Sequence, residues 1–183
     1  MLVSQQADQF LKSKTGQMFM GLILGDGTLT HSRFEHSQTY RYYEYSKHIS
    51  QQFQKQYPHL LTPKILSHHF RERKRIHPES LIHYQSQVFY TKNHDLFREL
   101  RKSFYPDGKK ILPIKIIEMY FTEESLLYLY LDDGTIGRQS QNKLSLCLCN
   151  FATLELESFQ SFLNRRFSYQ TTIHSKTRYP LIY

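Results

Sequence analysis

The chain of 183 residues carries 24 Lys and Arg against 16 Asp and Glu, which gives a formal net charge of +8. Its hydrophobic fraction of 39% includes 14 tyrosines and 13 phenylalanines, which is enough apolar surface for a folded core and argues against disorder. The positive charge favours a polyanionic partner, and no apolar run reaches the length of about 18 residues that a membrane-spanning helix needs.

The cysteines and the N-terminus indicate a reducing compartment. Cys147 and Cys149 are two residues apart, a spacing that does not suit a disulfide along one strand, and no Cys/His spacing is typical of a zinc finger. The N-terminal segment has neither the apolar core of a signal peptide nor the Arg-rich character of a transit peptide. The amino-acid bias, which includes the absence of tryptophan, is compatible with an AT-rich genome such as that of a mitochondrion or chloroplast.

Hydrophobic periodicity predicts helices and strands in alternation. In chain order, we expect an apolar helix over 17–24, a hairpin over 28–45, a helix over 49–55, strands over 64–73 and 85–91, and a helix over 93–104. Pro and Gly then interrupt regular structure, so 105–121 is a predicted linker. Beyond it we expect a helix over 123–131, a strand over 143–150, a helix over 156–163 and a strand over 169–176. Thr15 and Thr122 are the predicted N-caps of the two apolar helices.

One motif occurs twice. The segment LILGDGTL at 22–29 recurs as LYLDDGTI at 129–136 with five identical positions. The repeat predicts a mixed α/β chain with two αββαββα-like halves, 1–104 and 122–183, joined by 105–121. We expect a further helix after the last predicted strand, as in the first half, but the sequence ends at Tyr183 within that strand, so the second half is expected to be either truncated or minimal.

Each copy of the motif ends a segment that is apolar on every face. Such helices must be buried, and two of them bury each other most simply by packing together, which would bring Asp26 and Asp133 into one place. Two neighbouring carboxylates favour a divalent cation between them, and hard oxygen ligands select Mg²⁺, with Mn²⁺ as a substitute. Asp-Gly after a helix is also an ordinary turn signal, but two matched copies favour a functional pair.

The same residues carry a resemblance to a known family. The segments 19–27 and 126–134 resemble the two motifs of single-chain LAGLIDADG homing endonucleases, and 109–113 and 120–122 resemble the stretch that precedes the second motif. The likeness covers about 17–183. It implies a monomeric, metal-dependent endonuclease that cuts both strands of a long DNA site. Such proteins pack their motif helices at the centre and lay saddle-shaped antiparallel sheets in the major groove.

The resemblance also implies roles for individual residues. The residues that it assigns to the metal are Asp26 and Asp133, with the backbone carbonyls of Gly25 and Asp132. Lys110 matches a lysine at the periphery of the family's active site, and Lys176 is the candidate in the second half. Tyr128 departs from the family pattern, because it replaces the small residue found at Gly21 and requires a complementary notch in the facing helix.

Polar side chains on the predicted strands are candidates for DNA contacts, since Arg and Gln hydrogen-bond to guanine and adenine. The candidates are Arg33, Arg41, His68, Arg71, Arg73, Lys74, Arg75, Gln85, Gln87, Arg138, Gln139, Gln141 and Lys143. We expect most of the tyrosines between 40 and 45 to lie in the core or across the hairpin. Cys147 and Cys149 should face away from the core as reduced thiols.

Two other functions are compatible with this sequence. A basic sheet surface binds RNA as well as DNA, so the chain could be an intron RNA-binding maturase on the same fold. It could also be a DNA-binding regulator that does not cleave. Intact carboxylates in both motifs favour the endonuclease, because a pure binding protein has no need of paired acids.

Overall fold

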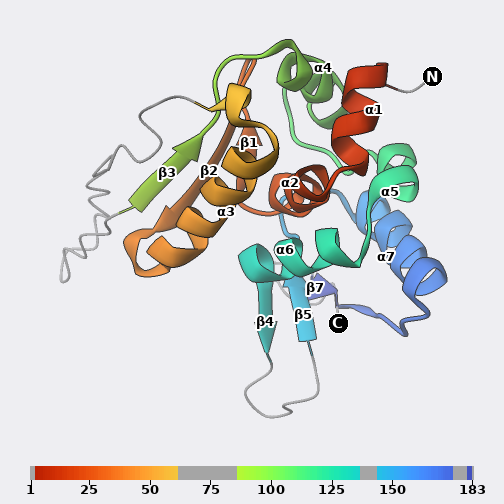
Figure 1. Ribbon diagram of the computed structural model, residues 1–183. Helices are drawn as coiled ribbons and strands as arrows, with labels where there is room; N and C mark the ends of the chain where they lie inside the picture. The colour runs from red at the N-terminus through yellow and green to blue at the C-terminus, as the bar shows by residue number, and fades with distance from the viewer. Residues whose placement is uncertain (1–2, 62–85, 137–143, 175–180, 183) are drawn as a thin grey trace. The chain divides into compact units, whose positions relative to one another are not determined.

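The computed structural model describes residues 3–61, 86–136, 144–174 and 181–182. Helices and antiparallel sheets alternate along the described chain (Figure 1), which confirms the predicted mixed α/β class. No helix in these ranges is long and apolar enough to cross a membrane. The chain forms two compact units, one of residues 26–98 and a discontinuous one of 1–25 with 99–183. The predicted boundaries at 104 and 122 follow the sequence repeat and stay a prediction.

The unit of residues 26–98 is an antiparallel sheet covered on one face by a helix (Figure 1). Its strands are β1 (Gly27–Leu29), β2 (Phe34–Thr39) and β3 (Ser86–Tyr90), in the order β1-β2-β3. The short helices η1 (Tyr40–Tyr42) and η2 (Pro58–Leu60) flank the covering helix α3 (Tyr43–Gln56). The rings of Phe34, Phe53 and Phe89 form the core between sheet and helix, with the centroids of Phe53 and Phe89 5.3 Å apart.

The predicted hairpin is correct up to Thr39 and wrong beyond it. The chain turns through η1 into α3 at Tyr43, although the sequence predicted a helix only from Ile49. Ser46, Ile49, Ser50 and Phe53 are the buried residues of α3, and the two serines at helical spacing carry no apolar signal. Tyr43 and Tyr45 are only half-buried and the side chain of Tyr42 is half exposed, so these three tyrosines lie outside the core.

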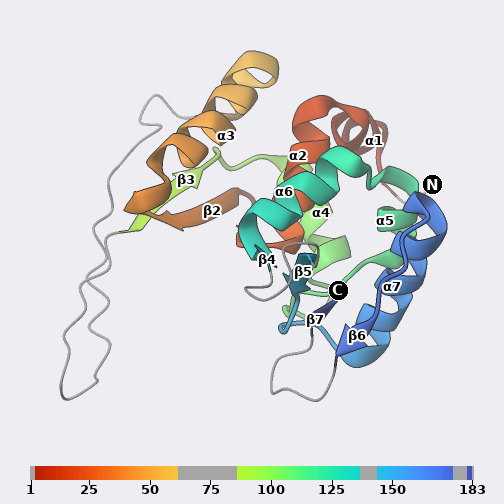
Figure 2. The same cartoon turned by 90° about the horizontal axis from the view of Figure 1, so that it is seen from below.

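The discontinuous unit contains the two motif helices. Its helices are α1 (Gln5–Lys12), α2 (Lys14–Leu24), α5 (Ile114–Tyr120), α6 (Glu123–Asp133) and α7 (Thr153–Phe167). Its strands are β4 (Gly134–Ile136), β5 (Leu144–Cys147), β6 (Ile173–His174) and β7 (Leu181–Ile182), in the order β4-β5-β7-β6. Helix α4 (Asp95–Phe104) spans the boundary between the two units. Figure 2 shows α5 beside α7, where Phe121 packs edge-on against Phe159.

The two motif helices begin differently. The hydroxyl of Ser13 caps α2 by accepting a hydrogen bond from the Gly16 amide at 3.0 Å, so Ser13 replaces the predicted cap Thr15. Thr122 caps α6 as predicted, in a capping box with Ser125. Ser13 is also the C-cap of α1. Because α1 and α2 share this residue, the cap of α2 lies two residues closer to the N-terminus than the predicted cap Thr15.

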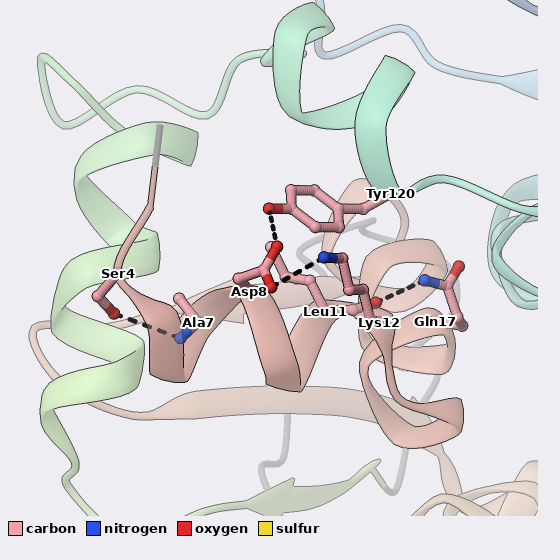
Figure 3. Close-up of polar contacts among 7 residues, drawn as sticks. All are labelled: Ser4, Ala7, Asp8, Leu11, Lys12, Gln17 and Tyr120. Atoms are coloured by element: carbon pink, nitrogen blue, oxygen red, sulfur yellow. Dashed lines mark hydrogen bonds and ion pairs between the residues drawn. The ribbon is translucent and has the colours of Figure 1, made fainter. Parts of the chain in front are cut away.

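A carboxylate ties α1 to α5 (Figure 3). Asp8 accepts hydrogen bonds from the Lys12 ammonium at 2.9 Å and the Tyr120 hydroxyl at 2.8 Å. These two donors lower the pKa of the Asp8 carboxyl. Burial, together with the bond to Asp8, raises the pKa of Tyr120 to about 12. The contact fixes the N-terminal helix against the segment that leads into the second motif.

Candidate active site at the ends of the motif helices

The two motif helices pack against each other, as predicted (Figures 1 and 2). Gly21 is a point of close approach. A Cβ atom added there would lie 2.2 Å from the carbonyl oxygen of Ser125 and 2.7 Å from the Cβ of Tyr128. The notch that Tyr128 requires is therefore the missing side chain of Gly21. The bulky residue of one copy fits against the glycine of the other.

A buried glutamine fixes the register of the crossing. The amide oxygen of Gln17 accepts hydrogen bonds from the hydroxyls of Thr122 at 2.7 Å and Ser125 at 2.8 Å. Its amide nitrogen donates to the carbonyl of Leu11 (Figure 3). A shift of either helix would leave these buried groups unpaired, which is costly in a dry interior.

The two helices also meet at their C-terminal ends. A Cβ atom added to Gly25 would lie 2.6 Å from the Cβ and 2.8 Å from the Oδ2 of Asp132. The ammonium of Lys110 donates a hydrogen bond to the carbonyl oxygen of Gly25 at 2.8 Å. The structure thus brings together three of the predicted site residues, Gly25, Asp132 and Lys110, from three separate segments of the chain.

Asp26 follows Gly25 and belongs to the other unit. Its Oδ2 accepts a hydrogen bond from the side-chain amide of Gln38 at 2.6 Å. Gln38 is not among the residues predicted from the sequence. The predicted hairpin was the only hint of this contact. In the structure, β1 pairs Gly27 with His36, and this pairing brings Asp26 alongside the end of β2, where Gln38 lies.

Asp133 is the last residue of α6, and β4 begins directly after it. The Sγ atoms of Cys147 and Cys149 lie 3.8 Å apart as free, half-buried thiols, while Leu146 and Leu148 are buried, as predicted. Burial is the main cause that raises the pKa of the Cys147 thiol, followed by its contacts with Cys149 and, last, by the charge of Asp133.

The donor atoms at the helix ends suit a hard divalent cation. The carbonyl of Gly25 is an oxygen donor that already interacts with a cationic group, the ammonium of Lys110, and the carboxylate of Asp132 adds a negative charge beside it. No three His, Cys, Asp or Glu side chains cluster as a metal site within the described ranges. Mg²⁺ is commonly bound by one or two carboxylates together with waters and substrate phosphates, so a smaller protein donor set fits it.

Few of the predicted DNA contacts lie in the described residues. Arg33 pairs with Glu35 and stacks over the ring of Tyr90, with its guanidinium 5.3 Å from the centroid. Arg41 is exposed in η1 rather than on a strand. The predicted residues that lie outside the described ranges are His68, Arg71, Arg73, Lys74, Arg75, Gln85, Arg138, Gln139, Gln141, Lys143 and Lys176.

Gln87, a predicted DNA contact, is buried instead, with only 3% of its surface exposed. The alternation along β3 places Gln87 and Phe89 on the buried face, while Ser86, Val88 and Tyr90 are half exposed. A polar residue in an alternating strand does not reveal which face it occupies, and the two aromatic residues Phe89 and Tyr90 lie on opposite faces.

Comparison with known proteins places this geometry in a family. A profile of the LAGLIDADG DNA endonuclease family matches residues 16–183, so the chain belongs to that family. The structure resembles that of the homing endonuclease I-WcaI bound to its DNA recognition sequence. The TM-score is 0.75, with 24% identity, over 98% of this chain and 81% of that one.

Three relatives are similar in sequence. The uncharacterized protein MJ1098 of Methanocaldococcus jannaschii is 29% identical over 87% of this chain and 59% of its own length. The probable intron-encoded endonuclease 1 of Wickerhamomyces canadensis is 29% identical over 76% of this chain and 58% of its own length. The cytochrome b mRNA maturase bI2 of Debaryomyces hansenii is 30% identical over 47% of this chain and 31% of its own length. The chain thus spans less than two thirds of each of these relatives.

Proposed function

We propose that the protein is a site-specific, metal-dependent endonuclease that acts as a monomer on double-stranded DNA. The observation that carries this proposal is the pair of motif helices in a LAGLIDADG chain, each of which retains its final aspartate. The helices cross closely at Gly21, and their ends meet at Gly25 and Asp132. A protein that only binds nucleic acid has no use for two matched acids at these positions.

The proposed roles follow from the chemistry of each residue. Asp26 and Asp133 hold the divalent cations, Mg²⁺ or Mn²⁺, with the carbonyls of Gly25 and Asp132 as additional oxygen ligands. The bound cations would supply Lewis acidity for phosphodiester hydrolysis. Lys110, held on the Gly25 carbonyl, places a positive charge at the ends of both motif helices, where it can stabilise negative charge on phosphate. Gln38 orients the carboxylate of Asp26.

A selection experiment tests both DNA binding and cleavage. The purified protein is bound to a randomised duplex library in Ca²⁺, and the recovered pool is then exchanged into Mg²⁺. We expect one enriched consensus and double-strand cuts within it. Asp26→Asn and Asp133→Asn should each bind the consensus within about threefold of wild type and lose at least about a hundredfold in cleavage rate.

Asp107→Asn is the matched control, because Asp107 is an exposed acid in the loop after α4. It should cut like wild type. Loss of DNA binding in the Asp26 and Asp133 variants would show that these carboxylates are structural. A consensus that wild type binds but never cuts in Mg²⁺ would favour the DNA-binding regulator.

An RNA-binding maturase is the second candidate, because one of the relatives is a cytochrome b mRNA maturase. Duplex DNA and folded intron RNA should be compared as competitors at the same salt concentration, since both affinities depend on ionic strength. The endonuclease proposal expects the selected duplex to compete better. Stronger competition by intron RNA, with no enriched duplex, would favour the maturase.

A further inference from the structure

The two copies of the motif differ at the residue before the final aspartate. That residue is Gly25 in the first copy and Asp132 in the second. The structure places these two equivalent positions in contact with each other. The three atoms nearest to a Cβ added at Gly25 are the Cβ, Oδ2 and Cγ of Asp132, at 2.6, 2.8 and 3.2 Å. The side chain of the second copy therefore fills the space that the first copy leaves.

The charges around this contact are unequal. Gly25 has the Lys110 ammonium on its carbonyl oxygen and the Asp132 carboxylate against its Cα. Asp132 is half-buried, so water screens its charge less than that of a fully exposed acid. The first copy contributes no charge at the equivalent position, because glycine has no side chain. The second copy thus adds one negative charge at a position where the first copy carries none.

A charge that only one copy of the motif carries can be a source of asymmetry between the two halves of an endonuclease. A fixed carboxylate strengthens the binding of a nearby cation and repels an approaching phosphate, and both effects fall off with distance. We propose that the side chain of Asp132 determines the order in which the two DNA strands are cut. This inference rests on the proposed function. The role of this side chain is electrostatic and is separate from that of the Asp132 backbone carbonyl.

The test measures the nicking of each strand. A duplex that carries the selected consensus, labelled separately on each strand, is cut in Mg²⁺ under single-turnover conditions. We expect wild type to cut one strand about fivefold faster than the other. Asp132→Asn, which keeps the shape and removes the charge, should bring the two rates within about twofold of each other.

The reciprocal exchange G25D/D132G is the sharper variant. Asp132→Gly removes the three atoms that lie nearest to a Cβ at Gly25, which makes room for a carboxylate in the first copy. This double variant should cut the opposite strand first. Glu123→Gln is the control, because it removes an equal charge from the exposed N-terminal end of the same helix and should leave the order unchanged.

A second readout does not depend on cleavage. The Ca²⁺ concentration that half-saturates DNA binding should rise about threefold in Asp132→Asn and stay unchanged in Glu123→Gln. Wild type that cuts both strands at equal rates, or Asp132→Asn that cuts with an unchanged ratio, would overturn the inference and leave the endonuclease proposal intact. A wild-type protein that binds the duplex in Ca²⁺ and never nicks it would overturn both.

Discussion

Helices α2 and α6 contain the same motif, yet their surroundings differ. Every residue of α2 from Thr15 to Leu24 is buried. In α6, Leu127 is 53% exposed and Leu131 is 51% exposed. These two leucines are the repeat equivalents of Met20 and Leu24, which are buried in α2. An apolar helix gains free energy from burial, but the elements that surround it decide which of its faces is covered.

The neighbours of α2 explain its burial. Phe19 packs edge-on against Phe10 of α1 and Phe104 of α4, with ring centroids 5.4 and 6.3 Å apart. Gly21, two residues further along the helix, faces α6. One side of α2 is therefore covered by aromatic rings, and the opposite side contacts α6. The apolar sequence of both motif helices predicts burial on all sides. That expectation is correct for α2 and wrong for the face of α6 that carries Leu127 and Leu131.

The largest expected effect separates the two helices directly. Leu24→Ala should lower the free energy of unfolding by about 3 kcal/mol, because it leaves a cavity in a buried site. Leu131→Ala, at the equivalent position of α6, should cost less than about 1 kcal/mol, since the side chain is already half in water. Urea unfolding of both variants measures the difference. Equal losses would mean that Leu131 is covered in solution.

The close approach of the helices supplies the next prediction. Gly21→Ala should lower the free energy of unfolding by about 2 kcal/mol, because the added methyl group would meet the backbone of Ser125. The exposed helical residue Gln54 provides a control, and Gln54→Ala should change stability by less than about 0.5 kcal/mol. A Gly21→Ala protein as stable as wild type would show that α2 and α6 are further apart.

The smallest effect is a pH dependence at the contact between α1 and α5. The pKa of Tyr120 is raised from 10 to about 12, so its contribution is fully present below pH 10 and is lost as the pH rises toward 12. The pKa of Asp8 is lowered from 3.8, so its contribution is present above that pH and is lost in more acidic solution.

Stability measured against pH tests this contact. Tyr120→Phe should make the alkaline loss of stability shallower than in wild type, and Asp8→Asn should make the acidic loss shallower. Identical profiles for wild type and both variants would exclude the contact as a source of pH dependence. Helix α3, in the other unit, provides a control at Glu44, where an exposed acid pairs with Lys47 at 3.6 Å. Glu44→Gln should leave both limbs of the profile unchanged.

Local pattern was sufficient for much of the fold. The stripe of Leu96, Phe97, Leu100 and Phe104 predicted α4, and the alternation of Leu144, Leu146 and Leu148 predicted β5. The cap at Thr122 was also evident from the sequence. These features depend on side chains within a few residues of one another, so the sequence contains all the information that they need.

The sequence by itself therefore determined the repeat, the final aspartate of each copy and most of the elements around them. It did not predict α1, or α5 within the predicted linker 105–121. Only the tertiary structure decided that Asp132 fills the space beside Gly25, that Lys110 reaches the Gly25 carbonyl from 85 residues away, and that Gln87 faces the core. It also decided which leucines of α6 stay exposed. Such facts depend on contacts between distant segments, and the packing that sets them is a property of the whole chain rather than of any local pattern.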